Sequence, residues 1–95
     1  MINPAPKPEV VRCSEFYEWV RGLPCLVCAE PSDPHHVKHR KGYGDKENLV
    51  PLCRAHHREG HGVGWETWLE RHPIRLEDVA VVLWAAWRKA HERTS

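Results

Sequence analysis

Four residues of the sequence combine the donor atoms and the spacing of a structural zinc site. Cys25 and Cys28 are separated by two residues, and Cys53 and His56 repeat this spacing after 24 intervening residues. Two residues between ligands allow a tight turn to aim both donors at one ion, and two such turns complete a tetrahedron. We therefore expect these four residues to bind structural Zn²⁺. The alternative is free thiols and an ordinary histidine at a helix start, and Cys13 is interpreted as a spare thiol outside the pattern.

Further histidines surround this pattern and indicate a second, separate site. His57 and His61 are four residues apart, so a helix places them on one face. His56 and His57 are neighbours about 100° apart around a helix, so one can bind zinc while the other faces elsewhere. His35 and His36 alternate in the same way on a strand. The alternative for each of these histidines, taken singly, is a partly exposed residue without a role. The remaining three histidines are interpreted in that way: His39, His72 and His91.

The basic side chains are concentrated in the segment that also carries most of the histidines. Residues 35–58 contain six basic and two acidic side chains, a net charge of +4, whereas residues 1–34 and 59–95 carry −2 and −1. A local basic surface can bind phosphate groups although the whole chain has a net charge of only +1. The alternative is an ordinary solvated surface.

The length and the composition limit the chain to one small domain. It has 95 residues, of which 41% are hydrophobic, which is too few for a doubly wound sheet or a deep enclosed pocket. No apolar run approaches the ~20 residues that cross a bilayer, and the first ten residues lack an apolar signal-peptide core. We therefore expect no membrane partner and a cytoplasmic location, where thiols stay reduced and bind metals.

A short hairpin followed by a helix is predicted to carry both groups of residues. The alternation of side chains predicts a strand over residues 35–40, and a glycine-containing turn over 42–45 leads to a second strand over 48–52. A helix is expected over 54–59, which the glycines from position 60 onward end. The zinc ligands lie on either side of this hairpin, so the ion would tie its ends together and contribute folding free energy.

Further helices are predicted on both sides of this core. Ser14 is expected to cap a short helix that Gly22 ends, and two later helices are expected over Trp65–Arg71 and from Leu76 to about residue 92. The five tryptophans are interpreted as core residues rather than as platforms for nucleic-acid bases. The predicted organisation is a flexible arm over residues 1–12 and a single domain over 13–95, with a zinc-stapled core at about 25–62 and a helical tail at 65–92.

Residues 25–61 resemble the HNH endonuclease motif of zinc-knuckled ββα-metal folds. The resemblance is carried by Asp33-Pro34-His35-His36, Asn48-Leu49-Val50-Pro51-Leu52-Cys53, His56-His57 and His61. Within that family the chain is most similar to small phage and prophage proteins, among them the recombination-enhancement nucleases that act with RecA. The resemblance implies an α+β fold with a ββα-metal core, flanked by an N-terminal helix and two C-terminal helices.

The resemblance also assigns roles to individual residues. It implies that His36 is the general base and that Asn48 orients the segment that carries this base. The implied ligands of one catalytic divalent metal are His35, His57 and His61. His56 stands where many relatives have a fourth cysteine, which leaves a Cys₃His zinc set, and the CxxH spacing favours His56 over His57 as its fourth member. Three imidazoles suit Zn²⁺ or a transition metal such as Ni²⁺, and Mg²⁺ or Mn²⁺ with water ligands are alternatives.

The chemistry of these residues favours phosphodiester hydrolysis. A neutral imidazole at His36 can take a proton from water near neutral pH. A divalent ion can bind a non-bridging phosphate oxygen and the leaving oxygen. Four basic side chains are expected to bind neighbouring DNA phosphates: Lys38, Arg40, Lys41 and Arg58.

Three functions are therefore compared. The leading prediction is a metal-dependent DNA endonuclease or nickase in a bacterial or phage-infected cell, acting as a monomer or a weak dimer. The first alternative is a zinc-stapled nucleic-acid-binding module without catalysis, which would have no use for His35, His36, Asn48 and His61 together. The second is an accessory subunit of a phage recombination or packaging complex, with a recombinase filament or a phage protein as a partner besides DNA.

Overall fold

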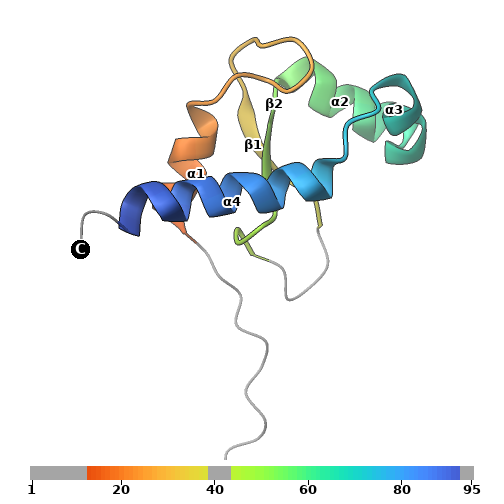
Figure 1. Ribbon diagram of the computed structural model, residues 1–95. Coiled ribbons are helices and arrows are strands. Elements are labelled where there is room, and N and C mark those ends of the chain that lie inside the picture. The colour runs from red at the N-terminus through yellow and green to blue at the C-terminus, as the bar shows by residue number, and fades with distance from the viewer. Residues whose placement is uncertain (1–12, 39–43, 93–95) are drawn as a thin grey trace, which may run out of the picture.

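A two-stranded antiparallel sheet lies at the centre of the fold. The computed structural model describes residues 13–38 and 44–92. In it β1 (Asp33–His36) pairs with β2 (Leu49–Leu52). The described residues also form four helices: α1 (Ser14–Arg21), α2 (Arg54–Val63), α3 (Trp65–Arg71) and α4 (Leu76–Glu92). The chain thus has the predicted α+β character (Figure 1), whereas the predicted arm over residues 1–12 lies outside the described residues.

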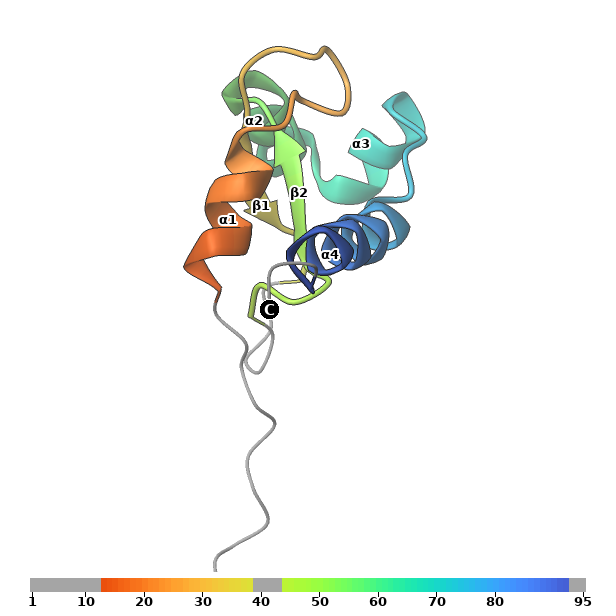
Figure 2. The same ribbon diagram turned by 60° about the vertical axis from the view of Figure 1, so that its left-hand side comes forward.

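The helices enclose β2 from both sides. α1 packs against both strands and α4 packs against β2 and α1, while α2 continues from β2 and packs against α3. Figure 2 shows α1 and α4 flanking β2. All four residues of β2 are therefore buried, whereas β1 has an exposed end at Asp33. Among these described helices, none has the length and the apolar composition of a membrane span.

Two hydrophobic groups meet at β2. The first joins β2 to the turn before β1 and to α3 and α4, through Cys25, Val50, Leu52, Cys53, Trp68, Leu76 and Ala80. The second joins β2 to α1 and α4, through Phe16, Val20, Leu49, Trp84 and Trp87. Three of the five tryptophans are thus core residues, as predicted, while Trp19 and Trp65 are only half-buried.

The helices α1, α3 and α4 begin and end close to where the sequence predicts, and only the start of α1 differs in its capping. The predicted cap Ser14 is the first residue of α1, and Cys13 occupies the N-cap position without a side-chain hydrogen bond. The Cys13 backbone N–H instead donates to the Asp45 carboxylate at 2.8 Å. A carboxylate from a distant loop therefore holds the backbone of the N-cap residue, while no side chain at the N-cap accepts from the first turn of α1.

β1 lies two residues earlier than predicted and is shorter. Regular pairing ends at His36, although the Val37 N–H still donates to the Asn48 carbonyl at 2.9 Å. The Asn48 side chain then replaces the strand partner, because it accepts from Lys38 N–H at 2.7 Å and donates to the Lys38 carbonyl at 2.9 Å. It also donates to the Gly44 carbonyl at 2.8 Å. The prediction of a strand over 35–40 was wrong because one buried amide side chain closes the hairpin.

α2 continues past the glycines that were expected to end it. The helix includes Gly60 and Gly62 and ends at Gly64, whose φ of +88° favours glycine. Gly60 has another function: a Cβ there would lie 2.3 Å from the Trp65 ring. The absence of a side chain at this position allows the indole to pack onto the helix backbone. The extra turn also places His61 within a regular helix.

These contacts predict opposite effects for two glycine substitutions in α2. Gly60→Ala forces the Trp65 ring to move and should destabilise the protein by about 1–3 kcal/mol, as overpacking does. Gly62→Ala meets no atom within 4 Å and should stabilise the helix by up to about 1 kcal/mol. Urea unfolding of both variants measures the difference. Equal effects of the two substitutions would contradict this role of Gly60.

Candidate metal centres

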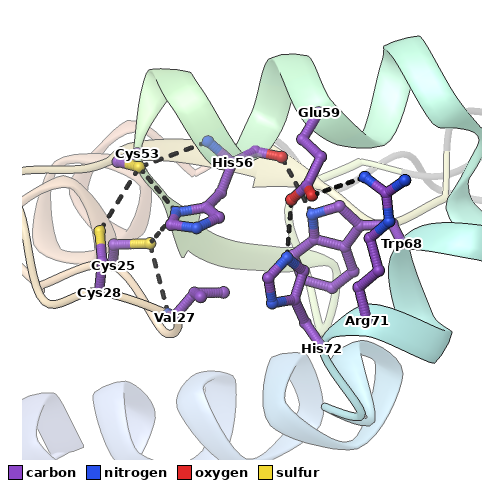
Figure 3. Close-up of polar contacts among 9 residues, drawn as sticks. All are labelled: Cys25, Val27, Cys28, Cys53, His56, Glu59, Trp68, Arg71 and His72. Carbon is purple, nitrogen blue, oxygen red and sulfur yellow. Dashed lines mark hydrogen bonds and ion pairs between the residues drawn. The ribbon is translucent and has the colours of Figure 1, made fainter.

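The residues predicted to bind zinc come together where the turn before β1 meets the start of α2 (Figure 3). Cys53 Sγ lies 3.1 Å from His56 Nδ1 and 3.7 Å from Cys28 Sγ. Cys25 Sγ lies 3.8 Å from His56 Nδ1. All four donor atoms lie within 4.8 Å of one another. The predicted set of ligands is thus assembled from two segments far apart in the sequence.

The separations of these donor atoms fit a tetrahedral zinc site. With Zn–S bonds of about 2.3 Å and Zn–N bonds of about 2.0 Å, tetrahedral ligands are about 3.8 Å apart for S···S and about 3.5 Å for S···N. The observed distances of 3.7, 3.8 and 3.1 Å lie close to these values. The donor set can therefore hold one structural zinc ion after small movements of the side chains.

The backbone on each side explains why the donors converge. A bridge between Pro24 and Pro31 closes the first turn, within which Cys25 N–H donates to the Glu30 carbonyl at 2.9 Å. Ala29 completes the turn in the left-handed region, at φ +64°. On the other side Cys53 is the N-cap of α2, and its sulfur accepts from the His56 N–H at 3.5 Å. The helix start therefore fixes the relative position of the second pair.

The thiols of the first pair have shifted pKa values even without a metal. Burial raises the pKa of Cys25, but hydrogen bonds from the backbone of Cys53, Cys28 and Val27 outweigh it and lower this pKa to about 6. A backbone hydrogen bond from Glu30 lowers the pKa of Cys28, but desolvation and the neighbouring sulfurs of Cys53 and Cys25 outweigh it, so the net shift is upward. The site thus favours the thiolate at Cys25 near neutral pH.

A polar cluster that the sequence analysis did not identify adjoins His56. Glu59 Oε1 lies 2.7 Å from His72 Nε2, and Glu59 Oε2 accepts from Arg71 at 3.1 Å (Figure 3). Donor atoms of His56, Glu59 and His72 all lie within 4.8 Å of one another. His72, which the sequence offers no reason to single out, thus has a structural contact in this cluster. The spacing of His56 and Glu59, three residues apart on a helix, was a signal for half of this cluster.

The three histidines implied to bind a catalytic metal lie side by side. His35 comes from β1, and His57 and His61 come from successive turns of α2. His57 Nε2 lies 3.1 Å from His35 Nδ1 and 3.0 Å from His61 Nε2. Nitrogen ligands at about 2.0–2.1 Å from a tetrahedral ion are about 3.4 Å apart, so each contact of His57 has a length close to that between two ligands of one ion. The ring centroids of His35 and His61 are 6.4 Å apart, and among the described residues these three histidines are not a group whose donor atoms all lie within 4.8 Å of one another.

Trp65 fixes the buried member of this group and borders a pocket. His35 is 3% exposed, and its ring stacks on the Trp65 indole with centroids 4.8 Å apart and planes at 29°. The same two side chains line one end of a pocket of about 520 Å³, which extends over Leu69 and Ile74 to the start of α4. A ligand in this pocket would therefore lie against His35, while His57 and His61 do not line it.

His36 projects to the other face of β1, as alternation along a strand requires. Its Nε2 lies 2.8 Å from Asp45 Oδ1, and Asp45 Oδ2 accepts from the Cys13 backbone. Asp45 is 6% exposed, so this carboxylate holds the imidazole from a buried position. The sequence predicts only a turn at Asp45, and nothing in the spacing of Asp45 indicates the contact with His36. Asn48 does not contact His36 directly and instead fixes Lys38, two residues further on.

The basic residues predicted to bind phosphate are placed only in part. Lys38 and Arg58 are both exposed, at the end of β1 and on α2 next to His57. Arg40 and Lys41 lie in the segment 39–43, outside the described residues. The structure thus shows two of these side chains to be exposed, and all four phosphate contacts remain predictions.

Comparison with known proteins gives a family but no activity. A family model described as "Protein of unknown function (DUF968)" matches residues 3–88. The "Uncharacterized protein YdfU" of Escherichia coli (strain K12) is 42% identical over 53 residues, which are 50% of this chain and 15% of that relative. The chain thus corresponds to a small part of the length of this relative. No solved structure matches the chain.

The cysteine cluster predicts a strong dependence of folding on zinc. Cys28 is exposed, so Cys28→Ser removes a ligand without opening the core. We expect this variant to lose the tightly held zinc ion and much of the folding free energy, because zinc sites of this kind contribute on the order of 10 kcal/mol. Cys13→Ser is the matched control and should keep the zinc ion and the folding free energy. Zinc analysis after gel filtration and thermal unfolding measure the outcome, and equal zinc content in the two variants would contradict the assigned ligands.

The Glu59 cluster predicts a pH-dependent contribution to stability. The hydrogen bond from His72 lowers the pKa of Glu59 below its ordinary value of 4.5. A carboxylate with a depressed pKa stabilises the fold above about pH 4.5, and this stabilisation is lost as the pH falls through the lower folded-state value. Glu59→Gln should therefore lower the thermal midpoint at pH 7, with a difference from wild type that shrinks towards pH 3.5. The exposed Glu66→Gln is the control, and a pH-independent difference for Glu59→Gln would refute this role.

Proposed function

The chain belongs to the DUF968 family, and we propose that it is a metal-dependent DNA endonuclease with an HNH-type ββα-metal core. Its site would be the group formed by His35, His57 and His61, beside a structural zinc site at the cysteine cluster. The observation that carries the proposal is the position of His57 Nε2, within 3.1 Å of a nitrogen from each of the other two rings. The resemblance to HNH nucleases supports the same assignment residue by residue.

A purely structural role does not account for this group of imidazoles. His57 Nε2 takes part in both contacts, yet in a neutral imidazole this atom has either one N–H or one lone pair, so it cannot form two full hydrogen bonds at once. Histidines in that arrangement are explained by a cation that they bind together. The cysteine cluster has its own four donors, so its ion does not require the histidine group.

The proposed metal would be held by His35, His57 and His61. When bound, a divalent ion supplies positive charge for a phosphate oxygen and for the leaving oxygen of the sugar. The donor set suits Zn²⁺ or Ni²⁺, while Mn²⁺ and Mg²⁺ are accommodated with additional water ligands. The Trp65 indole excludes solvent from one side of His35 and thereby fixes the orientation of the ring.

His36 would accept the proton of the attacking water. The Asp45 carboxylate accepts a hydrogen bond from Nε2–H of the neutral ring, which leaves the Nδ1 lone pair as the proton acceptor. A buried carboxylate also stabilises the imidazolium that forms when the proton arrives. Asn48 closes the hairpin at Lys38 and so keeps the segment after His36 in place.

The DNA would be bound through its backbone. Lys38 follows β1 and Arg58 lies next to His57 in α2, and both are exposed; the sequence adds Arg40 and Lys41 in the segment between the strands. Contacts of this type attract phosphate without reading the sequence, and their strength falls as salt rises. Further partners, such as a recombinase filament or a phage protein, would supply targeting that so small a basic surface lacks.

Cleavage of supercoiled plasmid tests the proposal. Wild-type protein with added Mg²⁺, Mn²⁺, Ni²⁺ or Zn²⁺ should nick the plasmid, and EDTA should stop the reaction. His36→Ala should lower the rate by about 10²–10⁴-fold, and Asp45→Asn, which acts through His36, by about 10-fold or more. His57→Ala should abolish nicking while the tightly held zinc remains.

The matched control is His91→Ala on α4, whose Nδ1 lies 2.7 Å from the Trp87 carbonyl of the same helix. This variant should cleave as fast as wild type. Protein that binds zinc and DNA but cleaves with none of the four metals would refute the endonuclease and support a binding module. Nicking that is unchanged in His36→Ala would refute the assigned base.

A further inference from the structure

The outward face of α4 is apolar at its centre and charged at its ends. Val81 and Val82 are 46% and 64% exposed, and Ala85 and Ala86 follow them on the same face. Asp78 precedes these four residues and Lys89 follows them, and both are exposed. A helix face that meets only water normally carries charged residues along its whole length. This composition therefore indicates a contact with another surface.

The rest of the fold packs on the opposite side of the helix. Ala80, Trp84 and Trp87 are buried against β2 and α1. At 100° per residue these three positions lie about half a turn away from Val82 and Ala85. In Figures 1 and 2, α4 lies at the outside of the described fold, with α1 and the sheet to one side of it.

The order of residues on this face has a two-fold symmetry. Consider a second copy of α4 packed antiparallel to the first, with a two-fold axis that passes midway between residues 83 and 84. Val82 then lies opposite Ala85 of the other copy, and Val81 lies opposite its Ala86. In the same register Asp78 meets Lys89 of the other copy. Each large side chain thus faces a small one, and each acidic end faces a basic one.

We propose that this face binds a second copy of the chain, as an antiparallel α4–α4 pair with its two-fold axis between residues 83 and 84. A two-fold interface uses the same patch on both subunits, which the symmetric register provides. The opposed helix dipoles favour the antiparallel sense. A parallel pair would instead place Asp78 against Asp78 and Lys89 against Lys89, so the charges select one direction. The proposal is independent of the endonuclease assignment.

The size of the face predicts a weak and reversible dimer. The interval from Asp78 to Lys89 spans about 16 Å of helix, and only one helix per copy takes part. Such a patch is smaller than the about 800 Å² per partner of a standard interface, so association should appear only at high protein concentration. The alanines compensate in part, because they allow the two helix backbones to approach closely.

Sedimentation equilibrium of the full chain, from about 10 μM to about 1 mM, tests the interface. Wild-type protein should change from monomer to dimer across this range. Val82→Glu places two charges near the axis and should weaken the dimer at least tenfold. Val63→Glu is the control, because Val63 is 36% exposed on α2, away from the α4 face, and should leave the dimer unchanged. A monomer at all concentrations, or a dimer that Val82→Glu does not weaken, would overturn the proposal.

A charge-reversal cycle tests the register. Asp78→Lys and Lys89→Asp should each weaken the dimer, because each places like charges opposite one another. The double variant Asp78→Lys with Lys89→Asp restores opposite charges at both ends and should recover most of the wild-type association. Asp78 also pairs with Arg75, the residue before α4, at 2.8 Å, so circular dichroism of each variant checks that α4 is intact. Failure of the double variant to recover association would refute this register.

Discussion

The contact between the turn before β1 and the first turn of α2 is the constraint on which the rest of the structure depends. It joins Cys25 and Cys28 to Cys53 and His56, and so closes the two ends of the hairpin. A chain of this length buries a modest core, and a domain's net stability is only about 5–15 kcal/mol. One zinc ion can supply a free energy of the same order. The cluster therefore decides whether the hairpin and α2 keep their relative position.

The same helix start serves the second group of donors. His56 and His57 are adjacent, yet the first faces the cysteines and the second faces His35 on β1. Neighbouring residues on a helix point about 100° apart, so a regular helical backbone is enough to direct His56 and His57 to different sites. Because both groups depend on the first two turns of α2, the orientation of this helix sets the geometry of each. The packing of Trp65 on Gly60 then holds the far end of the helix.

The sequence predicted site residues and element boundaries best where they are set by local spacing. It predicted them least well where they depend on contacts between residues distant in the chain. The zinc donors and most helix boundaries follow from local patterns, because turns and helical faces are set by residues close in the chain. The contacts of Asp45 with His36 and of Glu59 with His72 join residues that no period relates. The end of β1 was misplaced for the same reason, since one asparagine side chain replaces a strand partner. Gly60 shows that a glycine can serve packing rather than termination.

The hydrogen bond from the Cys13 backbone to Asp45 has a consequence for sequence variation at that position. Because the donor is a main-chain amide, nineteen of the twenty amino acids can occupy position 13 and still provide it. Proline alone lacks this N–H and would leave one oxygen of a buried carboxylate without its donor. Substitutions at position 13 are thus compatible with the His36–Asp45 pair, with the exception of a substitution by proline.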